Sequence, residues 1–209
     1  MKKTLLFLFF ITSCILNLTA QLTESFDAVT FPPTGWTNTQ VGGGTDLWNR
    51  VTATTQTAPT TTPHSGAGMA RYDAYNFLAG ESADLITPVL DFSSGTYQLK
   101  FWMFRDTRYP SSNDSLEIFI NTTQSGTGAS KLGSVWRNYL DAPAQAASGW
   151  YQYSFLIPGT FNTASNYIIF RANSDYGTEI VIDDVSINAV VACSGTPTAG
   201  TSSASVPFL

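Results

Sequence analysis

The sequence predicts an all-β domain, an antiparallel two-sheet sandwich for which we expect jelly-roll topology. Three observations lead to this prediction. Helical periodicity is almost absent, whereas apolar and polar residues alternate with a period of two in several short runs. Between these runs lie groups of Gly, Pro, Asn, Asp and Ser, the residues that favour turns. About nine short strands joined by polar turns are typical of a β-sandwich.

The predicted strands follow one another along the whole chain. The clearest alternation lies in five runs, at residues 97–105, 115–120, 150–157, 167–172 and 179–187. In the second run, Leu116, Ile118 and Ile120 fall on one face of the strand. Weaker candidates lie at residues 22–26, 68–72, 83–87 and 131–137. The segment at residues 52–63 is mostly Thr, Ala and Pro, so we expect a long surface loop there.

The N-terminus has the features of a secretory signal peptide, which we assign to residues 1–20. Two lysines precede an apolar run at residues 5–18, and Ala20 supplies a small residue before the cleavage point. The run is too short and too interrupted for a membrane span, and no later stretch is apolar enough to cross a bilayer. Lipoprotein processing at Cys14 is an alternative, although the apolar run continues past it. We therefore expect a secreted or cell-surface protein.

The rest of the chain divides into one large domain and a short tail. Residues 21–189 have a normal size for a single β-sandwich. Residues 190–209 contain the lone Cys193, and we expect a linker or the start of a truncated second domain, with further domains of the same polypeptide after Leu209. A frayed natural C-terminus is the alternative. Because Cys14 leaves with the signal peptide, no disulfide is expected within the mature domain.

The composition argues against a nucleic-acid partner. The chain carries 15 acidic residues against 10 Lys and Arg, and 12% of its residues are charged. A nucleic-acid-binding face requires clustered basic residues, and the mature sequence has no such cluster. Low charge together with abundant Thr, Ser, Gly and aromatic residues is instead typical of exported β domains.

The sequence gives no support for catalysis. His64 is the only histidine, so a nucleophilic triad or a catalytic zinc site would have to be built around it, and we expect a structural role. Asp183 and Asp184 are adjacent carboxylates, but neighbours on a strand point to opposite faces and do not work together as acid and base. No glycine-rich phosphate loop opens a helix. We therefore predict a protein that is not an enzyme.

The few acidic residues lie at positions where they could coordinate a cation. Glu24 and Asp27 lie at the start of the domain, and Asp46 lies in a glycine-rich loop. Asp183 and Asp184 lie in the last strand, where a charge is costly unless it is paired. If the first and last strands run side by side, their carboxylates and nearby loop carbonyls could supply the oxygen ligands of Ca²⁺. The alternative is that these side chains cap turns or pair with arginines.

The order of several short motifs resembles that of a known family. The motifs are Glu24-Ser-Phe-Asp27, Phe31-Pro-Pro-Thr-Gly-Trp36, Leu47-Trp48, His64-Ser-Gly66, Ala83-Asp-Leu-Ile-Thr-Pro-Val-Leu90 and Val181-Ile-Asp-Asp-Val-Ser-Ile187. Together they resemble the cleaved-adhesin domains of Bacteroidetes surface proteins, also called choice-of-anchor J domains, which are similar to the MAM domains of animal receptors. The resemblance spans residues 22–188.

This resemblance implies a jelly-roll adhesion module with calcium near the junction of its termini. By motif position, Glu24 and Asp27 match the opening acidic pair of the family. Asp183 and Asp184 match the closing pair, and Asp46 matches the acid before the loop Trp. Family members often have an acid-rich loop at that place, whereas this chain has one acid there. The tail resembles linkers that lead into Ig-like repeats, so the truncated second domain would be Ig-like.

Two functions remain open at this point. In the first, the domain is a non-catalytic adhesion or recognition module that binds a glycan or a protein through loops at one end of the sandwich. Aromatic faces stack on sugars or fill protein pockets, so its contact residues would be Trp102, Arg105, Arg108, Tyr109 and Tyr176. We expect the other four tryptophans in the core. In the second, the domain is a structural or accessory spacer of a larger secreted enzyme, such as a protease.

Overall fold

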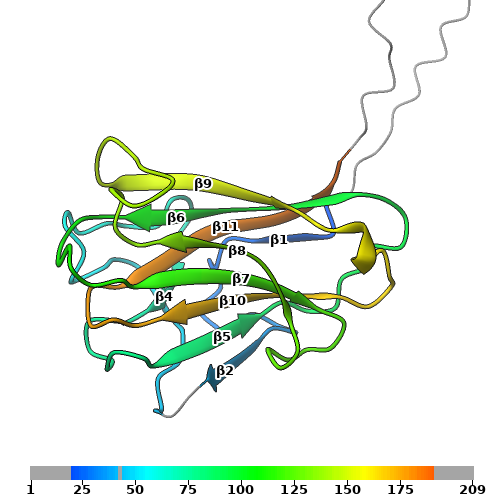
Figure 1. Ribbon diagram of the computed structural model, residues 1–209, viewed down its shortest axis with the longest axis horizontal. Coiled ribbons are helices and arrows are strands. Elements are labelled where there is room, and N and C mark those ends of the chain that lie inside the picture. Colours follow the sequence, from blue (N-terminus) through cyan, green and yellow to red (C-terminus); the bar gives the residue numbers. More distant parts are fainter. Residues whose placement is uncertain (1–19, 42–43, 191–209) are drawn as a thin grey trace, which may run out of the picture.

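The computed structural model describes residues 20–41 and 44–190, and these residues form strands joined by loops (Figure 1). The strands are β1 (Leu22–Glu24), β2 (Thr37–Val41), β3 (Asn49–Val51), β4 (Met69–Tyr72), β5 (Ser82–Ile86), β6 (Tyr97–Arg105), β7 (Ser115–Asn121), β8 (Ser130–Trp136), β9 (Gly149–Leu156), β10 (Tyr167–Asn173) and β11 (Ile180–Ala189). A short 3-10 turn, η1 (Gly159–Phe161), follows β9. In this described part of the chain, no helix is long and apolar enough to cross a membrane.

The strands form two antiparallel sheets. The first has the order β3-β4-β11-β6-β9, and β1 joins it by pairing with β11. The second has the order β2-β5-β10-β7-β8. Nearly every neighbour in each sheet is distant in sequence, so both sheets depend on long-range pairing. The predicted all-β fold, an antiparallel two-sheet sandwich, is confirmed.

Each of the predicted runs overlaps a strand, but β2 and β3 were not predicted. Their sequences, TNTQV and NRV, show no apolar alternation. Both lie at the edge of a sheet and pair with one neighbour, β2 with β5 and β3 with β4. Edge strands of this kind form because a stronger strand offers hydrogen bonds, and such pairing leaves no local signal in the sequence.

The core lies between the two sheets. On β6, the alternate residues Leu99, Phe101 and Met103 are fully buried. The facing sheet contributes residues such as Ile118 and Phe170, and the Phe101 and Phe170 rings meet edge to face at 5.4 Å. The period-two pattern read from the sequence therefore identifies the buried face of each central strand.

The tryptophans expected in the core divide between three environments. Trp36 and Trp48 lie in the core between the sheets. Trp150 packs instead on the outer face of the first sheet. Trp136 is 38% exposed, so the core prediction is wrong for this residue. It follows the buried Val135 at the end of β8, an edge strand, and alternation turns its side chain away from the core.

The outer face of the first sheet is covered by the loop at residues 52–68. Met69, Phe104 and Val181 form a second buried apolar cluster on this face. Trp150 packs against the cluster and donates its indole N–H to the loop at 3.2 Å. This face is therefore a small second core rather than a solvated surface.

The loop itself is held by a buried carboxylate. Glu179 is fully buried and accepts hydrogen bonds from the backbone N–H groups of Thr55 at 3.0 Å and Gln56 at 2.8 Å. Thr54 and Thr57 are also buried. The expectation of a plain surface loop is therefore wrong for this part of the segment, because its backbone supplies the donors that Glu179 needs.

The first and last strands run side by side, as expected. Leu22 lies opposite Ile187 and Glu24 lies opposite Val185. The Gln21 N–H donates to the Ile187 carbonyl at 2.8 Å, so the described start of the chain lies against β11. Apart from residues 20 and 190, the predicted signal peptide and tail, with both cysteines, lie outside the described residues.

Candidate functional site

Three loops meet at one end of the sandwich. They are residues 73–81 between β4 and β5, residues 106–114 between β6 and β7, and residues 174–179 between β10 and β11. Ser174 Oγ donates toward the carbonyls of the first loop, at Ala74 and Phe77, at 3.1 and 3.2 Å. The second and third loops are joined because Asp175 accepts a hydrogen bond from the backbone N–H of residue 113 at 2.7 Å.

Tyrosine side chains lie on the outside of these joined loops. Tyr75 and Tyr109 stack with ring centroids 5.9 Å apart and planes 28° apart. The Arg108 guanidinium lies 5.3 Å from the centre of the Tyr109 ring. Tyr109 is 39% exposed and Tyr176 is 60% exposed. We call Tyr75, Tyr109, Tyr176 and Arg108 the tyrosine surface.

The two most exposed tyrosines have an unusual backbone conformation. Tyr109 has φ 55° and Tyr176 has φ 61°, both in the left-handed region. For a non-glycine residue this region costs roughly 1–2 kcal/mol. Such strain persists only where the surroundings hold the residue in place, and it is concentrated at functional sites.

A buried ion-pair cluster supplies that constraint. Arg137 is fully buried and donates to Asp114 and to Asp106, each at 2.7 Å. Its Nη2 also donates to the Tyr109 carbonyl at 3.1 Å. Asp114 Oδ1 accepts the backbone N–H of Asp175 at 2.7 Å. The cluster therefore fixes both tyrosine-bearing turns from beneath.

The glycine after Tyr176 is required by the same cluster. A Cβ added to Gly177 would lie 1.8 Å from Asp114 Oδ2, which is far inside van der Waals contact. The Gly177 N–H donates to Asp114 Oδ1 at 3.1 Å. Burial is also the main influence on Asp106, whose pKa it raises even though Arg137 acts in the opposite direction. The tyrosine surface thus rests on a rigid, desolvated base.

Arg105 is not part of the tyrosine surface, although the sequence suggested it as a contact residue. It is fully buried at the end of β6. Its guanidinium donates to the Tyr153 hydroxyl at 3.0 Å and to carbonyls of the β8–β9 connection, among them Asp141 at 2.9 Å. The prediction that Arg105 contacts a ligand therefore needs correction, because its donors hold a loop from inside the molecule.

Trp102 also lies away from the tyrosine surface. It sits on the covered face of the first sheet, opposite Asp183 on β11. The His64 ring stacks on it with centroids 3.8 Å apart and planes 16° apart. Because His64 covers one face of the indole, Trp102 is placed as a support for the 52–68 loop. The expectation of a structural His64 agrees with this contact.

Four of the five predicted calcium ligands lie around the seam between β1 and β11. Asp183 is fully buried, and burial raises its pKa to about 6. Asp184, at φ 46°, accepts a hydrogen bond from the Ser65 hydroxyl at 2.6 Å and contacts His64 Nδ1 at 2.6 Å. The Glu24 and Asp27 carboxylates, also in this region, accept backbone N–H groups.

Asp46 lies in a different group of side chains. Its neighbours are Glu81 and Asp73, and burial together with the Glu81 carboxyl raises the pKa of Asp46 to about 6. Glu81 accepts the Leu78 N–H at 2.8 Å, which places this group beside the β4–β5 loop. The structure therefore does not bring Asp46 to the seam with the other four.

The seam offers the right donor chemistry for calcium but an incomplete arrangement. Carboxylate and carbonyl oxygens are the ligands that Ca²⁺ prefers. Within residues 20–41 and 44–190, however, no three or more acidic, His or Cys side chains gather closely enough to hold an ion together. Nearby carbonyls, at Phe26, Asp27 and Ala67, accept hydrogen bonds from Arg50 at 2.7 to 3.0 Å. The Arg50 guanidinium thus already binds loop carbonyls of the kind that the calcium prediction requires as ligands.

The same region does not have the geometry of a catalytic triad. Ser65 donates its hydroxyl to Asp184, and His64 contacts the other oxygen of the same carboxylate. A nucleophilic serine must instead contact the histidine ring, with the acid behind it. The three side chains therefore fasten the 52–68 loop to β11.

Several residues of the tyrosine surface and its base were not predicted from the sequence. Tyr75 lies in a turn-rich segment, Asp-Ala-Tyr-Asn, and an aromatic residue in such a turn is a usable signal. Arg137 had no such signal, because its partners Asp114 and Asp106 are 23 and 31 positions away. Tyr109, Arg108 and Tyr176 were predicted as contact residues, and the structure places them at this one end.

The fold is similar to that of several solved domains. The K1 and K3 cleaved adhesin domains of Lys-gingipain from Porphyromonas gingivalis W83 match with TM-scores of 0.61 and 0.58, at 19% and 22% sequence identity. The K1 match covers 83% of this chain and 99% of that domain, and the K3 match covers 82% and 100%. The K2 domain of Lys-gingipain matches at 0.59 and 18% identity, covering 79% and 96%.

Carbohydrate-binding modules share the same architecture. A tandem of such modules from Paenibacillus barcinonensis Xyn10C has a TM-score of 0.51 and 11% identity, covering 86% of this chain and 48% of that chain. No family model matches the sequence, and no curated protein matches it significantly. At these identities the likenesses show the fold, and they confirm at that level the resemblance to cleaved adhesin domains.

Proposed function

We propose that this chain is a non-catalytic, extracellular recognition module that binds a glycan through the tyrosine surface. The observation that carries the proposal is the pair of exposed tyrosines held at positive φ by a buried ion-pair cluster. Aromatic rings present large apolar faces with a polar hydroxyl, which suits the faces and hydroxyls of sugars. Three cleaved adhesin domains and a pair of carbohydrate-binding modules with this fold lend further support.

Rigidity is the second physical reason for this assignment. A flexible loop must lose conformational entropy when it binds, whereas a preorganised surface has lost it on folding. Asp114 and Arg137 fix the backbone on either side of the exposed rings. The backbone strain at Tyr109 and Tyr176 lowers stability, and a role in presenting the rings would explain its presence.

The test is binding of the chain expressed from Gln21 onwards to a glycan array, followed by titration calorimetry of the hits. Tyr176→Asn removes the ring while placing a residue that tolerates positive φ. We expect binding about tenfold weaker or more, equivalent to roughly 1.4 kcal/mol, with unchanged or slightly higher thermal stability. Tyr176→Phe keeps the ring and should retain most of the affinity.

A blank array would contradict glycan recognition, and so would full binding by Tyr176→Asn. In the first case the accessory-spacer function would be favoured, in which the domain supports a larger secreted enzyme without a ligand of its own. A protein ligand would be indicated if matrix proteins bound while glycans did not. Each of these outcomes is separate from the calcium prediction, which concerns the carboxylates at the seam between β1 and β11.

A further inference from the structure

The outer face of the second sheet carries a row of polar residues in register. Thr39 on β2 lies opposite Asp84 on β5, and Asp84 lies opposite Arg171 on β10. Arg171 in turn lies opposite Glu117 on β7. Alternation places this row on the solvent side of the sheet, since the intervening residues, such as Phe170, are in the core.

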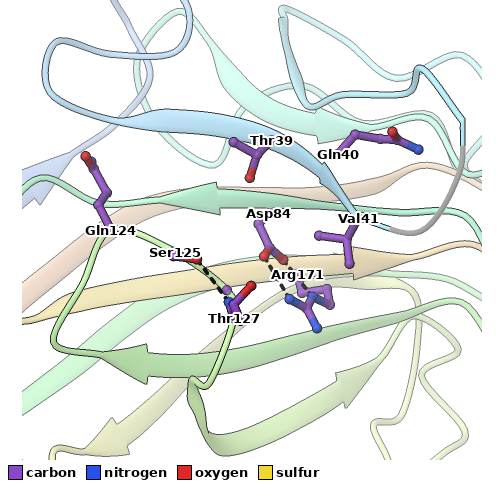
Figure 2. Close-up of a pocket in the computed structure, with 9 residues that line it drawn as sticks. Thr39, Gln40, Val41, Asp84, Gln124, Ser125, Thr127 and Arg171 are labelled. Carbon is purple, nitrogen blue, oxygen red and sulfur yellow. Dashed lines mark hydrogen bonds and ion pairs between the residues drawn. The ribbon is translucent and has the colours of Figure 1, made fainter.

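A loop closes over part of this row and turns it into a pocket. The β7–β8 connection, residues 122–129, reaches back across the sheet, where Gln124 Nε2 donates to the carbonyls of Gly35 at 2.8 Å and Thr87 at 3.0 Å. Residues 39–41 form one wall and residues 124–127 the other, as Figure 2 shows. The pocket is open to solvent on one side and has a volume of about 510 Å³, within the range of small-molecule sites.

The loop backbone lies directly against the floor of the pocket. A Cβ on Gly126 would come within 2.1 Å of Asp84 Oδ2 and 2.5 Å of Arg171 Nη2. A side chain there would fill the pocket or push the loop away. Glycine at this position therefore allows the loop backbone to lie directly on the ion pair.

The floor is a bidentate ion pair. Arg171 Nε donates to Asp84 Oδ1 at 2.7 Å, and Nη2 donates to Oδ2 at 2.8 Å (Figure 2). The guanidinium lies over the Phe119 ring at 4.9 Å, which fixes its plane. A guanidinium has five N–H donors, and within the described residues the other three have no hydrogen-bond partner. The Asp84 side chain is 1% exposed and that of Arg171 is 20% exposed, so Arg171 is the accessible partner.

The charges around the floor cancel. Asp84 neutralises Arg171, and the neighbouring Glu117 is paired with Lys131 at 2.6 Å. An anion or a cation would therefore gain little net attraction here, and either would have to displace an existing partner. A neutral hydroxyl group can accept from the exposed part of Arg171 without displacing Asp84.

We propose that this pocket binds a neutral sugar residue, with a hydroxyl that accepts hydrogen bonds from Arg171. Side-chain hydroxyls on both walls, at Thr39 and Thr127, supply further hydrogen bonds. No aromatic side chain lines the pocket, so binding is polar and weak, with a dissociation constant of about 1 mM. The proposal shares its ligand class with the proposed function but uses different residues on a different part of the molecule.

The test is an NMR titration of the isotope-labelled chain with glucose, galactose, mannose and xylose, each to about 20 mM, well above the expected dissociation constant. At least one sugar should shift the backbone amides of Gly126 and Thr127 and the Arg171 Nε–H signal. Any shift of the Tyr109 and Tyr176 amides reports sugar at the tyrosine surface and is scored separately. Glucuronate serves as the charged control and should bind no more tightly than glucose.

Two variants test the pocket and are expected to fold normally. Thr127→Val removes one wall hydroxyl but leaves the backbone bonds of the loop, and we expect affinity about two- to tenfold weaker. Arg171→Lys keeps the charge but loses the two-pronged geometry and should abolish the shifts, with circular dichroism confirming the fold. Tyr176→Asn should leave the shifts unchanged.

The proposal is overturned if no sugar shifts the pocket amides, or if glucuronate binds more tightly than every neutral sugar. It is also overturned if Thr127→Val binds normally while Tyr176→Asn abolishes the shifts. That last pattern would leave the tyrosine surface as the glycan site. Conversely, shifts at the pocket support this inference whether or not the tyrosine amides also move, and the tyrosine surface is tested separately on the glycan array.

Discussion

The two outer faces of the sandwich are built in opposite ways. The first sheet turns an apolar cluster outward, around Phe104 and Val181, and covers it with residues 52–68. The second sheet turns a polar row outward, centred on Asp84 and Arg171, and leaves a pocket beneath a shorter loop. Both loops cross a sheet, but the loop at residues 52–68 packs against its sheet, whereas the loop at residues 122–129 leaves an open pocket.

This difference divides stability from recognition. A loop that buries apolar side chains and satisfies a buried carboxylate contributes to folding, and its residues are not free to meet a ligand. A loop that rests on an ion pair through a glycine leaves the Arg171 guanidinium partly exposed. The first face is therefore expected to tolerate few substitutions, whereas the second should tolerate many at the level of stability.

The largest expected effect comes from removing the carboxylate beneath the covering loop. Glu179→Ala leaves Arg71 and the backbone donors of Thr55 and Gln56 without their acceptor. Breaking a buried pair in this way costs about 3–5 kcal/mol. The measurement is the free energy of unfolding by urea denaturation.

The matched control is a glutamate on the open face. Glu117 forms a partly exposed pair with Lys131, and such pairs contribute about 0–1 kcal/mol. Glu117→Ala should therefore change the free energy of unfolding little. Equal losses from the two alanine variants would show that the faces do not differ as described.

The contrast between the faces also explains how far the sequence could predict the molecule. The strong alternation of β6 and β7 identified central strands and their buried sides. The covering of the first sheet left no local signal, because Glu179 bonds to donors 123 and 124 positions away in a Thr-rich segment. Arg105 was wrongly expected at the surface, since the carbonyls that bury its charge come from residues 138–143.

The second prediction concerns calcium at the seam, which borders the covered face. If Ca²⁺ binds the native state alone, a hundredfold excess over its dissociation constant stabilises the protein by about 2.7 kcal/mol. This corresponds to a rise in melting temperature of about 5–10 °C for a domain of this size. Melting curves in Ca²⁺ and in EDTA measure the shift.

Two variants locate the ion in that experiment. Asp183→Asn should abolish the shift, because this carboxylate lies at the seam. Asp46→Asn should leave it unchanged, because Asp46 lies beside Glu81 instead. Identical curves in Ca²⁺ and EDTA would contradict the calcium prediction, and a shift lost only in Asp46→Asn would move the site to the β4–β5 loop.

The third prediction uses the pH dependence of the same buried carboxylate in EDTA. Burial raises the pKa of Asp183 to about 6, above its unfolded value of 3.8. The native state therefore holds a proton that the unfolded state releases, and stability falls as pH rises from about 4 to 6. The expected loss from this group is about 1–3 kcal/mol.

Asp183→Asn should flatten that slope, measured as the free energy of unfolding between pH 4 and 6. The slope is a better measure than stability at one pH, since an amide nitrogen cannot accept the N–H of Ser65 or Asp184 as the carboxylate does. Asp91→Asn is the control, because hydrogen bonds from Ser93 lower the pKa of that exposed group. A slope that is unchanged in Asp183→Asn would place its origin elsewhere, with Asp46, whose pKa is also raised to about 6, as the other source.

The smallest expected effect comes from one substitution made on both faces. Thr39→Val, on the exposed edge strand β2, should change the free energy of unfolding by less than about 0.5 kcal/mol. Thr54→Val, in the covering loop, removes a buried hydroxyl that accepts the Thr61 N–H at 2.8 Å, and should cost about 1–3 kcal/mol. Both changes keep a β-branched side chain of similar shape, so a difference in urea stability isolates the buried hydrogen bond. If Thr39→Val lowered the free energy of unfolding as much as Thr54→Val, the polar row would have a structural role. Sugar binding would then not be needed to explain the polar residues of the pocket.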